Sequence, residues 1–381
     1  MTRHWMMALA MGAGLMTGAG TAQAQMMGAG HGTMMHEAGD KAGMHMQMHG
    51  PTGVMGRHLM PEGKVMLGYS FGMMRMEGLA TGTSRLDPTV AATSVPNRFF
   101  GLPMQPPALR VIPEEMDMQM HMFSAMYGAS DRVTLMAMVP YVEKSMTATT
   151  YAGPAGTRVL GSNKMRSEGL GDVTVGAVIG LYKQGRGALN MGIGASLPTG
   201  SISERGTMLS PMGTTPEMRM AYGMQLGSGT LDLKPSLTWT SGKGRLTWGA
   251  QVRGVIRTGD NAAGYTLGDV AAVTAWASHK PSRWFSYSAR LAATSQGRIR
   301  GIDPFIRGPM PGSDPANYGG EAVMAYLGAE LTLRSGALTG HRIGLATGPP
   351  AYQAANGVPP HRDRSALAAV PETAEAVRGA M

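Results

Sequence analysis

The sequence predicts an all-β protein, a transmembrane antiparallel β-barrel of about 12 strands preceded by a disordered N-terminal segment. Three observations predict this fold. Apolar side chains alternate with small, polar or charged ones in at least eleven segments of the chain, an export signal precedes those segments, and short connections alternate with long ones. Barrels of bacterial outer membranes share all three properties.

The alternation has a strict period of two, which places successive side chains on opposite faces of a strand. In residues 189–197 every odd position is apolar, whereas the even positions hold Asn, Gly, Gly and Ser. Farther along, Trp248 and Val252 alternate with Gln251 and Arg253. One such strand also fits a soluble sandwich. Many such strands, each of about ten residues and following an export signal, favour a membrane barrel.

The first 24 residues have the properties of a signal peptide. Arg3 and His4 precede an apolar stretch at 5–15, and Ala22-Gln23-Ala24 is a small-x-small cleavage site. The mature chain is therefore expected to start near Gln25. It divides into a Met/His-rich flexible segment at 25–63, the barrel at 64–347, and a last loop with an atypical tail at 348–381.

Composition narrows the function classes. The 381-residue chain contains no cysteine, so it has neither a disulfide framework nor a thiolate metal site. Its 56 glycines suit the turns and curved wall of a barrel. The net charge of +9 comes from Lys and Arg residues that are scattered singly, which argues against nucleic-acid binding.

Connection lengths predict the topology. Short turns lie near Asp131, Gly185, Gly242, Pro281 and Gly336, and long connections lie between them, as periplasmic turns and extracellular loops do. The expected strands are 64–76, 115–127, 132–146, 169–182, 188–198, 228–240, 245–257, 265–278, 284–296, 318–334 and 341–347.

Eleven strands are an odd number, whereas single-chain bacterial barrels have an even number, so a twelfth strand should follow the loop at 351–354. The chain after His361 is rich in Ala and charge and lacks clean alternation. The tail is therefore expected to be disordered or weakly helical, and a frame disruption in the gene after about Val358 is a hypothesis for it.

Three short motifs carry a family resemblance: Glu168-Gly169-Leu170-Gly171-Asp172-Val173, Ser196-Leu197-Pro198-Thr199-Gly200-Ser201 and Gly264-Tyr265-Thr266-Leu267-Gly268-Asp269. From about Lys64 to Asn356 the chain resembles the outer-membrane transporter family named after the meta-pathway of phenol degradation. The resemblance implies an outer-membrane barrel with a transport role and no particular substrate. The C-terminus departs from the family, whose barrels usually close with a strand ending in an aromatic residue.

The segment before the barrel combines two kinds of soft or borderline metal ligand. Half of the ten histidines lie there, beside many of the 37 methionines. Thioethers favour Cu(I), and imidazole accepts Cu(I) or Cu(II), so copper is the expected cofactor, with silver as a chemical analogue of Cu(I). The candidate ligands are His31, Met34, Met35, His36, Met44, His45, Met46, Met48, His49 and His58.

Other residues are expected to face the lumen. Met116, Met118, Met120 and Met122 are assigned to the lipid side of their strand as plain hydrophobes. The odd-numbered residues of the same strand would then face the lumen, together with inward-pointing residues of other strands. The predicted lumen-lining residues are Asp117, Gln119, His121, Met136, Met138, Arg253, Arg290, Glu330 and Arg334. The basic ones either favour anionic solutes or pair into a plug of salt bridges.

The functional hypothesis is an outer-membrane transporter or channel that is linked to copper handling and metal resistance through its N-terminal segment. Alternatives are a non-conducting metal-buffering or structural barrel, and a channel for aromatic organic solutes. Expected partners are outer-membrane lipid and periplasmic copper proteins. No enzyme activity is expected, because the hydrolase-like pattern around Ser70 lies within an alternating strand instead of a strand-turn-helix elbow.

Overall fold

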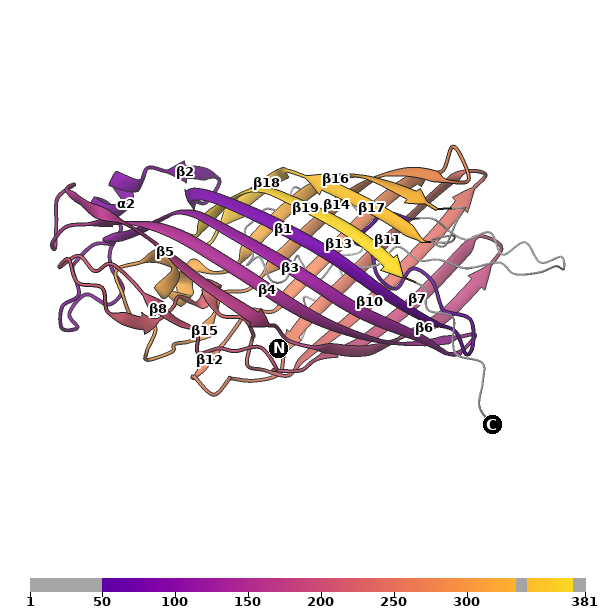
Figure 1. The fold of residues 1–381 in the computed structure, drawn as a ribbon, viewed down its shortest axis with the longest axis horizontal. Helices are drawn as coiled ribbons and strands as arrows, with labels where there is room; N and C mark the ends of the chain where they lie inside the picture. The colour runs from indigo at the N-terminus through magenta and orange to yellow at the C-terminus, as the bar shows by residue number, and fades with distance from the viewer. Residues whose placement is uncertain (1–49, 334–340, 373–381) are drawn as a thin grey trace, which may run out of the picture.

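A computed structural model describes residues 50–333 and 341–372 of the chain. Within these residues, twelve antiparallel strands form a closed wall, because β14 pairs with β16 and β19 pairs with β1 (Figure 1). The wall strands are β1 (Val65–Thr81), β3 (Val111–Ser130), β4 (Val133–Tyr151), β6 (Thr174–Gln184), β7 (Gly187–Ser196), β10 (Asp232–Lys243), β11 (Leu246–Arg257), β13 (Val270–His279), β14 (Phe285–Gln296), β16 (Gly320–Thr332), β17 (Arg342–Gly348) and β19 (Pro360–Glu372). The predicted fold class is confirmed.

The long loops gather at one end of the barrel, at the left of Figure 1, and carry the short elements. These are β2 (Ser84–Leu86), α2 (Pro88–Ser94), β8 (Arg205–Thr207), β9 (Glu217–Arg219), η1 (Tyr222–Met224), β12 (Tyr265–Thr266), β15 (Arg300–Gly301), η2 (Pro311–Ser313), η3 (Pro315–Asn317) and β18 (Pro350–Ala355). We take this end as extracellular and the end with short turns as periplasmic. Among the described residues no helix is long and apolar enough to cross a membrane.

The twelfth strand, β19, lies in the tail, where no strand was predicted from the sequence. β19 pairs with β1 from Leu67↔Glu372 to Leu79↔Pro360, and its other edge pairs with β17. The expectation of a disordered or weakly helical tail is therefore wrong for residues 360–372. The closing strand is encoded in this reading frame. A frame disruption is therefore not needed to explain the tail.

One predicted strand, 169–182, consists of two pieces. β5 (Val159–Leu170) pairs with the extracellular half of β4, and β6 pairs with its periplasmic half. Gly171, Asp172 and Val173 lie between the two pieces, outside any strand. β4 is thus longer than β6 and β7 and extends beyond them toward the extracellular loops, as Figure 1 shows.

The outer face of the wall is an apolar belt. Outward-pointing side chains such as Phe123, Trp239, Val252, Leu291 and Leu327 are all 45–71% exposed to the surroundings of the barrel. Burying so much apolar surface in acyl chains is favourable, whereas exposing it to water is costly. The described part of the chain therefore has the surface of a membrane-spanning barrel.

Candidate functional site

One side of the lumen is a wall of thioethers. The inward side chains of β1, β3 and β4 include Met66, Met74, Met76, Met116, Met118, Met120, Met122, Met126, Met136, Met138 and Met146. The register places Met76, Met116 and Met146 directly opposite one another on three neighbouring strands. Nearly all of these side chains are buried, and most belong to one continuous apolar cluster.

Methionine and leucine occupy different positions in this protein. Among the described residues, 17 methionines but only 4 leucines are buried, whereas 3 methionines and 15 leucines are among the large exposed apolar side chains. General methionine enrichment would place the two residue types on both faces alike. The lumen thus has a flexible, polarizable lining, and the lipid-facing surface has a branched aliphatic one.

The lumen is also basic. Among the described inward-facing residues of the wall strands, the carboxylates Asp232 and Glu330 are outnumbered by Lys144, Lys234, Arg253, Arg257, Arg290, Arg342 and Arg362. Arg257 and Asp232 form a buried ion pair. The Arg290 guanidinium carbon lies 4.0 Å above the centre of the Tyr326 ring. The lumen therefore carries excess positive charge, most of it on strands outside the thioether wall and some, from Lys144 and Arg362, directly beside the methionines.

The chain before β1 plugs the periplasmic half of the lumen. Residues 50–60 are mostly buried and bind wall strands from around the barrel. The carbonyl groups of Gly53, Met55 and Gly56 accept hydrogen bonds from Arg290, Gln251 and Asn190, the Thr52 hydroxyl donates to Glu330, and the Met60 N–H donates to Thr134. This plug is packed, whereas the sequence suggested a flexible tether there.

The extracellular end of the lumen is covered by the loop that contains η1. The Lys144 ammonium donates to the Gly223 carbonyl at 2.9 Å, and the Ser167 hydroxyl donates to the Met224 carbonyl at 2.7 Å. The Tyr318 hydroxyl accepts from the Gly223 N–H and donates to the Gly312 carbonyl. Burial raises the pKa of Tyr222 to about 12, so its hydroxyl stays neutral while it accepts the Asp303 N–H.

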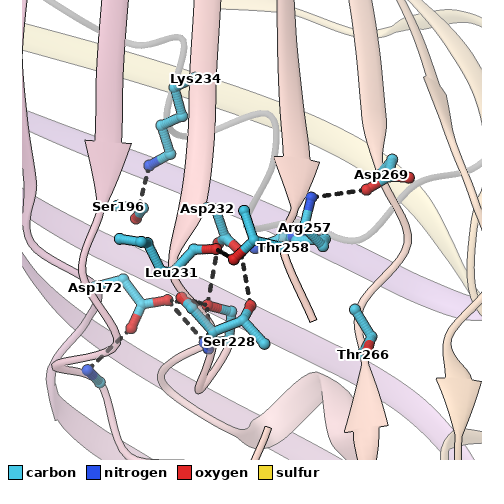
Figure 2. Close-up of polar contacts among 12 residues, drawn as sticks. Asp172, Ser196, Ser228, Leu231, Asp232, Lys234, Arg257, Thr258, Thr266 and Asp269 are labelled. Carbon is cyan, nitrogen blue, oxygen red and sulfur yellow. Dashed lines mark hydrogen bonds and ion pairs between the residues drawn. The ribbon is translucent and has the colours of Figure 1, made fainter. Parts of the chain in front are cut away.

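The family-like motifs meet in one polar cluster at the extracellular rim (Figure 2). The Asp172 carboxylate accepts from the Gly200 N–H at 3.0 Å and from the Ser228 N–H and hydroxyl, each at 2.7 Å. The Ser228 hydroxyl also contacts Asp232, and the Arg257 N–H donates to Asp269 at 2.8 Å. These carboxylates tie the break between β5 and β6 to the extracellular ends of β10, β11 and β13, so their role here is structural.

Two cavities lie in the lumen between the plug and the η1 loop. The upper one encloses about 890 Å³ of empty space, part of it open to solvent. Its lining includes Met76, Met116, Met118, Met146, Met224, Tyr222 and Tyr318, together with Lys144 and Arg362. The lower one, of about 780 Å³ by the same measure, is bounded by Met55 and Gly56 of the plug and lined by Met122, Met138, Lys234 and Arg253.

The structure corrects the side assigned to β3. Met116, Met118, Met120 and Met122 face the lumen, whereas Asp117, Gln119 and His121 lie on the outer face. There the Tyr69 hydroxyl is 2.7 Å from the His121 Nδ1 atom, and Arg75 contacts Asp117. The lumen-facing set includes Met136, Met138, Arg253, Arg290 and Glu330, and Arg334 is outside the described residues.

Most of the proposed copper ligands also lie outside the described residues. These are His31, Met34, Met35, His36, Met44, His45, Met46, Met48 and His49. His58 belongs to the plug and is half-buried. Within residues 50–333 and 341–372 no group of three or more His, Asp or Glu side chains is placed to hold a metal ion. Sequence reasoning missed the plug and the continuous thioether wall, although the even-numbered methionines of β1, β3 and β4 carry the signal.

The fold, the apolar belt and the enclosed lumen define an outer-membrane β-barrel. Ser70 lies in the middle of β1 and is buried, so the hydrolase-like pattern has no nucleophile elbow. Residues 119–297 match the family described as "Putative MetA-pathway of phenol degradation". Among curated proteins, no relative matches the sequence.

Solved outer-membrane proteins are similar to this chain at low sequence identity. An outer membrane channel from Pseudomonas putida F1 is 10% identical with a TM-score of 0.50, and the alignment covers 83% of this chain and 97% of the channel. The P. putida toluene transporter TodX is 10% identical (TM-score 0.43, 84% and 92% covered), and a Pseudomonas aeruginosa FadL homologue is 11% identical (0.42, 81% and 90%).

Proposed function

We propose that this protein is an outer-membrane channel for small aromatic solutes. The observation that carries the proposal is the upper cavity, where flexible methionine side chains and two tyrosine rings line a space between the plug and the η1 loop. A thioether wall adapts to ligands of different shape, and tyrosine rings stack on aromatic ones. The match to a family described by phenol degradation supports the same substrate class.

Filling the cavity should stop uptake. Met118 is 2% exposed and lines the upper cavity, so the larger indole of Met118→Trp would occupy the space that the solute needs. We expect uptake of a radiolabelled monoaromatic hydrocarbon by intact cells to fall about tenfold, a loss of about 1.4 kcal/mol of solute stabilisation. Uptake is compared with that of cells lacking the protein.

A matched control places the same indole on the outer face. Val175 on β6 is 40% exposed on the outer side, so Val175→Trp changes the surface without changing the lumen. Cells with this variant should take up the hydrocarbon at the wild-type rate. Equal uptake by wild-type cells and cells lacking the protein would refute the channel proposal.

The second candidate function is copper handling by the Met/His-rich segment. Two observations favour it. Methionine is used by position in the described chain, so thioethers are more than a general filler. Residues 50–60 of the same segment lie inside the lumen, so a metal captured by the Met/His cluster at 44–49 would be held beside the channel. Cu(I) suits a mixture of thioether and imidazole ligands. Periplasmic copper proteins are the corresponding partners.

Silver, a redox-inert analogue of Cu(I), tests this candidate in chloride-free buffer. We expect the purified full chain to bind silver. The five-site variant Met44→Leu/His45→Ala/Met46→Leu/Met48→Leu/His49→Ala should lose most of that binding. The control Met116→Leu/Met146→Leu removes two lumen thioethers and should bind like the wild type. Unchanged binding by the five-site variant would refute the segment's role, and binding lost only in the control would move the site to the lumen.

A further inference from the structure

Both lumen cavities have the same two-sided chemistry. In the upper cavity, Lys144 and Arg362 lie beside the thioether wall, and in the lower one Lys234 and Arg253 do. The register places Arg362 directly opposite Met76 and Lys144 directly opposite Met118, so each cation adjoins a methionine on the same face. A cation next to an apolar wall is repeated at two levels along the lumen.

The basic groups continue toward the periplasm. Below the lower cavity, the plug lies against Arg290, and Arg57 of the plug interacts electrostatically with Arg342, Arg290 and Glu330. A positively charged path with low-dielectric walls attracts anions and repels cations. The thioether and aliphatic side chains that also line the lumen favour a ligand with an apolar body, because contact with them removes apolar surface from water.

We propose that the lumen selects small carboxylates with an apolar aromatic body over neutral and cationic aromatics of the same shape. This proposal rests on the proposed channel function and specifies its substrate. The carboxylate faces Lys144 and Arg362 in the upper cavity and Lys234 and Arg253 in the lower one. The ring packs on the methionines, and in the upper cavity also on Tyr222 and Tyr318.

A matched set of soluble probes tests the selectivity. We chose 4-fluorobenzoate, 4-fluorobenzyl alcohol and 4-fluorobenzylammonium, which differ in head-group charge on the same ring. Their binding to the full-length protein in detergent micelles is followed by fluorine NMR. We expect the carboxylate to bind at least about tenfold more tightly than the ammonium, because only the carboxylate can accept charge-assisted hydrogen bonds from the lumen cations. Equal affinity for the two probes would overturn the proposal.

Removing one lumen cation should affect the carboxylate alone. Arg253→Gln keeps a polar side chain beside the lower cavity and removes its charge. We expect 4-fluorobenzoate affinity to fall about tenfold while 4-fluorobenzyl alcohol affinity stays unchanged. The control Arg186→Gln removes the same charge from a half-buried position in the turn between β6 and β7, outside the lining of both cavities, and should bind all probes like the wild type. A parallel fall for both probes would indicate altered cavity shape and contradict the charge argument.

The two proposals fail differently. If intact cells take up aromatic solutes through the protein but the probes bind without regard to charge, the channel function stands and the selectivity is wrong. If uptake depends on neither the protein nor Met118→Trp, the channel function itself is wrong. The wild-type probe series needs no variant, so a folding defect in Arg253→Gln leaves the selectivity testable.

Discussion

Ending the chain after Gly357 should abolish barrel assembly, because this change removes β19. The strand forms a long antiparallel ladder with β1 and a second one with β17. Without it, two strand edges would present unpaired N–H and C=O groups to lipid, and each such group costs several kcal/mol. We expect no heat-modifiable, membrane-inserted form of the shortened protein on electrophoresis of unheated samples.

Ending the chain after Glu372 is the matched control. This variant keeps β19 in full, so we expect it to insert and to show the same heat-modifiable band as the complete chain. An inserted, heat-modifiable form of the chain that ends at Gly357 would show that β19 is dispensable for closure.

Two-residue alternation predicted every wall strand except β19. Segments such as 189–197 have apolar side chains on one face and small or polar ones on the other, and the structure has β7 there. The tail was missed because β19 is rich in Ala and charge and alternates poorly. Its strand state depends on pairing with the edges of β1 and β17, which are far away in the sequence.

The sidedness of β3 was predicted wrongly for a physical reason. In a barrel with a watery lumen, polar residues such as Asp117 and Gln119 point inward. In this barrel the lumen beside β3 is apolar, and the polar residues lie on the outer face with Tyr69 and Arg75 as neighbours. Sequence parity identifies the two faces of the strand, but only the cross-strand partners show which face points inward.

The plug was beyond sequence reasoning, because its contacts come from strands throughout the barrel. Thr52, Gly53 and Gly56 resemble a flexible linker in sequence, yet in the structure they contact β16, β14 and β7. Gly53 has a φ of +97°, and a Cβ atom at this position would lie 3.2 Å from the Arg290 guanidinium. The backbone conformation favours glycine there, and a larger residue would also have to displace the Arg290 guanidinium slightly.

Fixing the plug to the wall should stop transport, because the plug occupies the periplasmic half of the lumen that a solute must cross. A Cβ atom on Gly344 of β17 would lie 3.5 Å from the Thr52 Cβ atom, which is within the range of disulfide-bonded cysteines. The chain has no cysteine of its own, so Thr52→Cys/Gly344→Cys forms a single defined disulfide. We expect oxidised cells to take up a radiolabelled monoaromatic hydrocarbon no faster than cells lacking the protein, and a membrane-permeant reductant to restore uptake. Thr52→Cys alone should transport equally with and without reductant. If the oxidised double variant transports at the reduced rate, the solute leaves the lumen without displacing the plug.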